Sequence, residues 1–80
     1  MRRETILRLR NAKPFRPFKI IMVSGREYLV PHRDFINVGL DEIYYFHVSL
    51  PVGVMEKQEI LSLMLVERLE PEELRAAIEG

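Results

Sequence analysis

The sequence contains no cysteine, only two histidines and no long apolar segment. The absence of cysteine excludes disulfides and thiol chemistry, and it fits a reducing compartment. The most apolar runs, residues 20–23 and 63–66, are far shorter than the roughly 20 residues that cross a bilayer. We therefore expect a cytoplasmic protein without a membrane partner, stabilised by its own hydrophobic core.

Residues able to carry catalysis are equally sparse. The four glycines lie far apart, so no phosphate-binding loop is present, and no serine has an adjacent base. One cluster, His32-Arg33-Asp34, has catalytic residue types, and with His47 it supports a small hydrolase or metal-binding protein as the least favoured alternative. A metal site needs three or four ligands, so we favour a structural role in which Asp34 caps a turn and His32 orders the loop. We expect no enzyme, no metal and no cofactor.

The charged residues are unevenly distributed along the chain. The 80 residues suit one domain, 1–80, and 48% hydrophobic with 30% charged residues is typical of a folded one. The net charge is zero, but residues 1–19 carry +6 and residues 20–80 carry −6. The basic segment could neutralise phosphates, or it could face the acidic remainder of the same molecule or of a second copy.

The N-terminal segment has helical periodicity. Over residues 3–12, Ile6 and Leu9 fall on one face, and Pro14 ends the pattern. A helix this short must dock on other structure. Phe15 and Phe18 are expected to pin it to a sheet.

The central segment predicts short strands joined by turns. A hairpin centred on Gly25 is the strongest pattern, and Phe18, Ile20 and Met22 are expected to share one face of its first strand. Residues 49–57 are expected to form the longest loop. The strands are expected at residues 18–23, 26–30, 35–38 and 43–48.

The C-terminal segment is more ambiguous. Residues 59–70 predict a strand, a 3₁₀-like turn near 62–64 and a last strand to Leu69, but periodicity leaves strand against helix open over 59–66. A helix over 56–69 is the alternative. Proline and acidic residues then predict a final helix over 71–79.

This order of elements predicts a mainly β (α+β) fold. Short strands joined by tight turns are better paired in a curled sheet than in a broad open one. We expect a small SH3-like or Sm-like five-stranded barrel over 18–69, with an N-terminal helix and a C-terminal helix.

Four segments resemble a family of short, uncharacterised bacterial proteins, and the likeness extends over most of residues 6–70. They are Pro14-Phe15-Arg16-Pro17-Phe18-Lys19-Ile20, Ser24-Gly25-Arg26-Glu27, Val30-Pro31-His32-Arg33-Asp34-Phe35 and Leu65-Val66-Glu67-Arg68-Leu69-Glu70. The resemblance implies no activity. A weaker topological resemblance is to Sm-like barrels, but the spacing of Gly25, Asp34 and Asn37 departs from their first motif. Their RNA-binding residues therefore do not carry over.

Together these patterns predict a non-enzymatic binding or scaffold module that associates with itself or with another protein. A chain of this size has barely enough core to stand alone, and its divided charge suits contact between copies. The alternative is an RNA- or DNA-binding Sm-like module using the basic N-terminus. Its phosphate contacts would be Arg8, Arg10, Arg16 and Lys19, and Tyr44 or Tyr45 would stack on bases.

Overall fold

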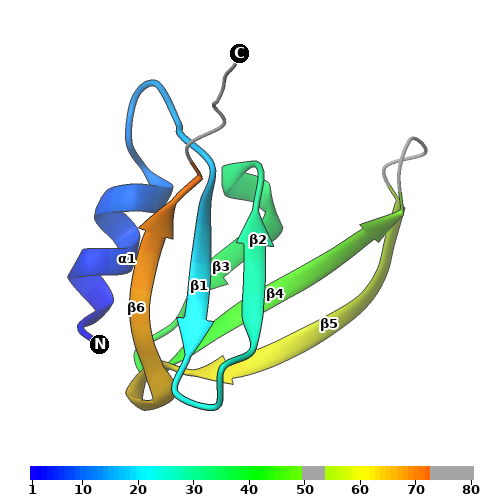
Figure 1. The fold of residues 1–80 in the computed structure, drawn as a ribbon. Helices are drawn as coiled ribbons and strands as arrows, with labels where there is room; N and C mark the ends of the chain where they lie inside the picture. Colours follow the sequence, from blue (N-terminus) through cyan, green and yellow to red (C-terminus); the bar gives the residue numbers. More distant parts are fainter. Residues whose placement is uncertain (50–53, 73–80) are drawn as a thin grey trace.

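The computed structural model describes residues 1–49 and 54–72 of the chain. Over these residues the fold is mainly β, as expected, with one α-helix and two 3₁₀ turns (Figure 1). Its elements are α1 (Arg3–Arg10), β1 (Phe18–Met22), β2 (Glu27–Val30), η1 (Arg33–Phe35), β3 (Ile36–Val38), β4 (Glu42–Ser49), β5 (Val54–Ser62), η2 (Leu63–Leu65) and β6 (Val66–Pro71).

The strands form two antiparallel three-stranded sheets rather than the closed barrel expected from the sequence. One sheet has the order β2-β1-β6 and the other β3-β4-β5, and no strand of one pairs with a strand of the other within residues 1–49 and 54–72. The chain passes from the first sheet to the second through Pro31 and η1. Proline donates no hydrogen bond to a ladder, and β2 ends directly before Pro31, in agreement with the separate strands predicted at 26–30 and 35–38. The described residues hold six strands where a five-stranded barrel was expected.

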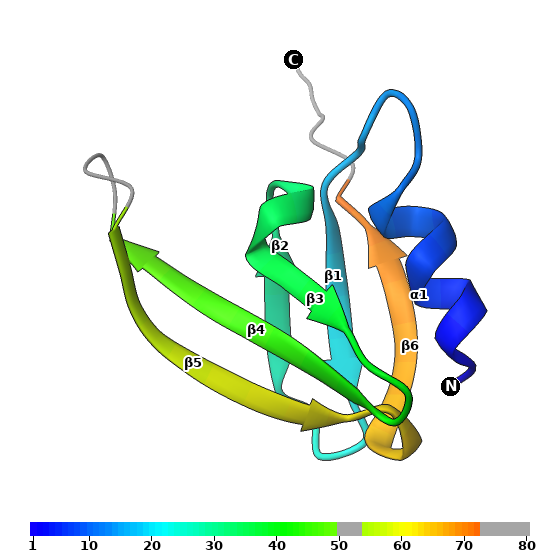
Figure 2. The same ribbon diagram turned by 180° about the vertical axis from the view of Figure 1, so that it is seen from behind.

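The core lies between the two sheets, which cross one another in both views (Figures 1 and 2). As predicted, Phe18, Ile20 and Met22 share the buried face. Ile21 is also buried, whereas Val23, directly after the end of β1, is exposed. The largest fully buried side chains are Ile6, Phe18, Ile20, Val30, Ile36 and Ile43. Each contributes about 1.5–3 kcal/mol of burial free energy, as an upper bound.

Helix α1 is held to the second sheet by arginines as well as by Ile6. Arg3 Nε donates to the Gly39 carbonyl at 2.8 Å, and Arg10 Nε donates to the Ile36 carbonyl at 2.8 Å. Ile36 is the first residue of β3 and Gly39 directly follows the strand, so α1 lies along the edge of β3. The helix ends at Arg10 rather than at residue 12, with Asn11 as its C-cap.

The predicted hairpin is confirmed, and Gly25 in its turn has a φ of 96°. The strand, 3₁₀ turn and strand predicted for 59–70 are also confirmed as β5, η2 and β6, so the helix over 56–69 is wrong. The loop over 49–57 is wrong for Ser49, which ends β4, and for residues 54–57, which belong to β5, while 50–53 lie outside the described residues. Similarly, Pro71 ends β6 instead of opening a helix, and residues 73–79 of that prediction lie outside the described part.

Within the described part of the chain, no helix has the length and apolar character needed to cross a membrane.

Candidate functional site

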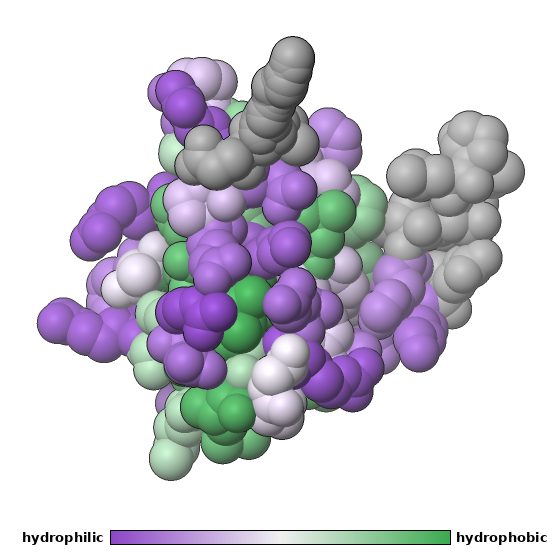
Figure 3. Space-filling view, in the orientation of Figure 1, coloured by the Kyte–Doolittle hydropathy of each residue, from purple (hydrophilic) through white to green (hydrophobic). Residues whose placement is uncertain are grey.

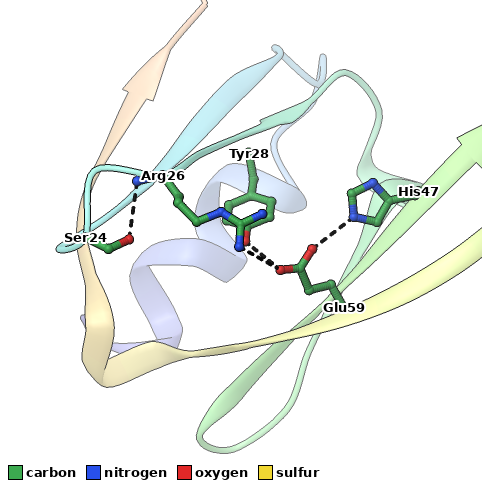
Figure 4. Close-up of polar contacts among 5 residues, drawn as sticks. All are labelled: Ser24, Arg26, Tyr28, His47 and Glu59. Atoms are coloured by element: carbon green, nitrogen blue, oxygen red, sulfur yellow. Dashed lines mark hydrogen bonds and ion pairs between the residues drawn. The ribbon is translucent and has the colours of Figure 1, made fainter.

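A carboxylate on β5 joins the two sheets. Tyr28 Oη on β2 donates to Glu59 Oε2 at 2.7 Å, and Arg26 Nη1 lies 3.6 Å from the same oxygen. His47 Nε2 on β4 lies 3.1 Å from Glu59 Oε1 (Figure 4). Both carboxylate oxygens are therefore engaged by side chains from three different strands or turns.

These contacts shift the pKa values of Glu59 and Tyr28. The hydrogen bond from Tyr28, the contact with His47 and the positive charge of Arg26 lower the pKa of Glu59. Burial first, and then the bond to Glu59, raises the pKa of the Tyr28 hydroxyl. Glu59 therefore stays ionised at neutral pH, where it accepts hydrogen bonds and has no proton to give as a general acid.

Tyr45 supports this cluster from the core. Its ring packs edge-on against those of Tyr28 at 5.1 Å and His47 at 4.9 Å. Its hydroxyl donates to the Leu29 carbonyl of β2 at 2.6 Å, and burial raises its pKa. Tyr45 thus forms a second bridge between the two sheets.

A shallow groove of about 230 Å³ lies beside the cluster. Val23, Ile60 and Leu65 on its border are 58%, 61% and 52% exposed, and Met64, next to Leu65 in η2, is 84% exposed. Figure 3 shows hydrophobic surface at the lower end of the view, where Figure 1 places η2 and the β1–β2 turn. The lining is Met22, Val23, Ser24, Arg26, Tyr28, Glu59, Ile60, Leu61, Ser62 and Leu65.

The four basic residues expected to contact phosphates are not equivalent. Arg10 donates to the border of β3, as described above, and Lys19 lies 3.4 Å from Glu27 on the adjacent strand. Arg8 on α1 and Arg16 in the following loop are exposed. Two of the four are therefore already engaged within the chain.

The two candidate stacking residues lie on opposite faces of β4. Tyr44 is half-buried on the outer face, opposite Ile60 in the register, and its hydroxyl is 3.4 Å from a Glu42 oxygen. Tyr45 is only 8% exposed and belongs to the core, so its ring is not open to a nucleic-acid base. Of the pair, only Tyr44 has a partly exposed ring.

The histidine cluster is also separated by the fold. His32 and Asp34 are exposed at η1, whose N-terminus has no side-chain capping hydrogen bond, in contrast to the cap expected from Asp34. His47 contacts Glu59 instead. Within residues 1–49 and 54–72, no group of three or more histidine, aspartate or glutamate side chains is arranged to hold a metal ion.

The cluster around Glu59 was not predicted from the sequence. Its one local signal is that Glu59 closes the polar run of residues 56–59, directly before a largely apolar stretch that ends at Leu65. Arg26 and Tyr28 are distant in sequence and meet Glu59 only because the two sheets cross.

Comparison with protein-family models, with curated proteins and with solved structures finds no match for this chain.

Proposed function

We propose that this protein is a small non-enzymatic binding module that associates with itself through the apolar groove and the neighbouring edge of β5. The observation that carries the proposal is that Val23, Ile60 and Leu65 are each more than half exposed around one groove. Clustered exposed apolar side chains mark interaction surfaces more often than scattered ones do. Because about half of each side chain is still exposed, its burial against a partner would contribute about 1 kcal/mol.

The proposed fold family is consistent with such a role. We infer a half-open SH3-like or Sm-like barrel, in which β5 continues through η2 into β6 and β6 returns to pair with β1. The split between β2 and β3 at Pro31 and η1 would be an interruption of one long bent strand. We also propose that the chain is related to the short bacterial proteins that it resembles, and that it is located in the cytoplasm.

A second copy is the partner we favour because of the size and charge of the chain. A domain of this length has a marginal core, and association of copies is one of the ways in which such domains gain stability. The competing nucleic-acid module is disfavoured by the engagement of Arg3, Arg10 and Lys19 within the chain. Buried Tyr45 weighs against it as well.

Light scattering after size-exclusion chromatography tests the proposal. The wild-type chain is expected to show more than one chain per particle as its concentration rises from micromolar to millimolar. Ile60→Thr is expected to shift the equilibrium toward the monomer, because it removes the most exposed apolar side chain that lines the groove. Leu29→Thr is the matched control, since Leu29 is 42% exposed on another strand and does not line the groove. A strict monomer at every concentration would rule the proposal out.

A further inference from the structure

The edges of the two sheets are protected to different degrees. The edge of β3 is occupied by α1, whose Arg3 and Arg10 donate to its border carbonyls. The edge strand β6 carries an ion-paired run in which Arg68 lies 3.1 Å from Glu67 and 2.8 Å from Glu70. Occupied edges and charged edges both discourage strand addition.

The remaining two edges belong to β2 and β5. On β2, the Leu29 carbonyl accepts the Tyr45 hydroxyl, so part of that edge is used inside the molecule. Within the described residues, β5 pairs with β4 alone, and in both ribbon views it forms the outer border of its sheet (Figures 1 and 2). The outer edge of β5 is therefore the one most open to another strand.

The sequence of β5 suits pairing with its own copy. Gln58 is the middle residue of Val54–Ser62 and is flanked by Lys57 and Glu59. When two such strands run antiparallel and overlap fully, the two Gln58 residues meet and each Lys57 lies opposite the Glu59 of the other copy. Opposite charges directly across a strand pair are stabilising.

Registers shifted by one residue do not place Lys57 opposite Glu59. Moving the symmetry axis by one residue places Lys57 or Glu59 opposite its own copy, where like charges repel. The β4–β5 ladder is regular from Lys57 to Ser62, and its irregularity lies beyond, between the pairs of His47 and Val48. The backbone is therefore regular from Lys57 toward the groove, and the irregularity of β5 falls at residue 56, two residues from Gln58 on the other side.

We propose that two copies of this chain pair antiparallel along the outer edges of β5, with Gln58 at the two-fold axis. This joins two three-stranded sheets into one of six strands, in the order β3-β4-β5-β5-β4-β3. The inference rests on the proposed self-association and specifies its geometry. It also places Ile60, 61% exposed in the single chain, two residues from the axis and within reach of the second copy.

Cysteine crosslinking tests the register, because the natural chain has no cysteine. Directly opposite residues of an antiparallel pair have Cα atoms about 4.5–5.5 Å apart, within the range of about 4.4–6.8 Å that a disulfide bridges. Mild oxidation of Gln58→Cys is therefore expected to give a covalent dimer on a non-reducing gel. Lys57→Cys is the near control, since its two copies would be diagonal neighbours about 7–8 Å apart. Asn37→Cys, exposed on β3, is the distant control.

A charge variant gives an independent measure. Lys57→Glu is expected to weaken dimerisation by roughly 2- to 10-fold, because both cross-strand pairs become repulsive. Faster crosslinking of Gln58→Cys than of both controls, together with this loss, would support the proposal.

Three results would overturn it. Dimers in light scattering with Gln58→Cys crosslinking no faster than Asn37→Cys would reject this pairing and leave the proposed self-association standing. Particles larger than a dimer would indicate head-to-tail contacts in place of a two-fold axis. A strict monomer would reject both the pairing and the proposed function.

Discussion

Tyr28 donates a 2.7 Å hydrogen bond to Glu59, and this bond connects one sheet of the protein to the other. The same carboxylate also contacts His47 and Arg26. Because the two sheets share no backbone pairing within the described residues, such side-chain bridges add to the hydrophobic core in fixing their relative position. Glu59 is therefore expected to influence stability strongly for a residue that is partly exposed.

The first prediction concerns the dependence of stability on pH. The folded-state pKa of Glu59 is lowered by Tyr28, His47 and Arg26, so its ionisation stabilises the fold above the unfolded-state pKa. That contribution is lost as the pH falls from the ordinary glutamate value of about 4.3 through the lower folded-state pKa. Glu59→Gln is expected to be less stable than wild type at pH 7, with the difference shrinking below pH about 4. Urea unfolding across this pH range measures it.

Glu27→Gln is the control for this titration, because Glu27 is an exposed carboxylate on β2 whose ion pair within the described residues is with Lys19. Its effect on the free energy of unfolding should stay within about 0.5 kcal/mol. If the stability difference between Glu59→Gln and wild type were unchanged from pH 7 to pH 3, the coupling would be refuted.

The second prediction concerns the guanidinium that holds α1 to the edge of β3. Arg10→Ala removes the donor to the Ile36 carbonyl and is expected to lower the free energy of unfolding by about 0.5–1.5 kcal/mol. Arg8→Ala, two residues earlier and exposed, should change it by less than about 0.5 kcal/mol. Thermal or urea unfolding of the two variants compares them directly. Equal losses would contradict the prediction, because alanine has at least the helix propensity of arginine and only Arg10 donates to the Ile36 carbonyl.

Local patterns predicted the strands better than the contacts between them. The hairpin at Gly25 and the strand–turn–strand of residues 59–70 are encoded by neighbouring residues, through turn chemistry and alternation. The separation into two sheets depends on the direction that the chain takes after Pro31 and η1. That direction is set by packing between residues that are far apart in the sequence.

The candidate site was less predictable for the same reason. Arg10 appeared as one of several basic residues, but its carbonyl partner at Ile36 lies 26 positions away. Similarly, Tyr45 is of a residue type that can stack on bases, but it is buried in the core. The alternation of side chains along β4 turns Tyr45 inward and Tyr44 outward. Residue types indicated the available chemistry, and the fold determined which groups are already used internally.

The third prediction tests the anchoring of α1 by its apolar side chain. Ile6 is fully buried and is the one buried residue of this helix. Ile6→Ala is expected to cost about 2–5 kcal/mol, since the cavity adds to the lost transfer free energy. Leu40→Ala, at a position 80% exposed, should be nearly neutral. A small loss for Ile6→Ala in urea unfolding would show that α1 is dispensable for the core.

The fourth prediction concerns the turn between β1 and β2. Gly25 has a φ of 96°, in the left-handed region that side chains with a Cβ disfavour, although no atom lies within 4 Å of where a Cβ would be. Gly25→Ala is therefore expected to cost about 1–2 kcal/mol through backbone strain alone. Gly25→Asn should cost less, because asparagine tolerates positive φ better than alanine does. Equal losses for the two variants in urea unfolding would point to a steric clash and contradict the backbone explanation.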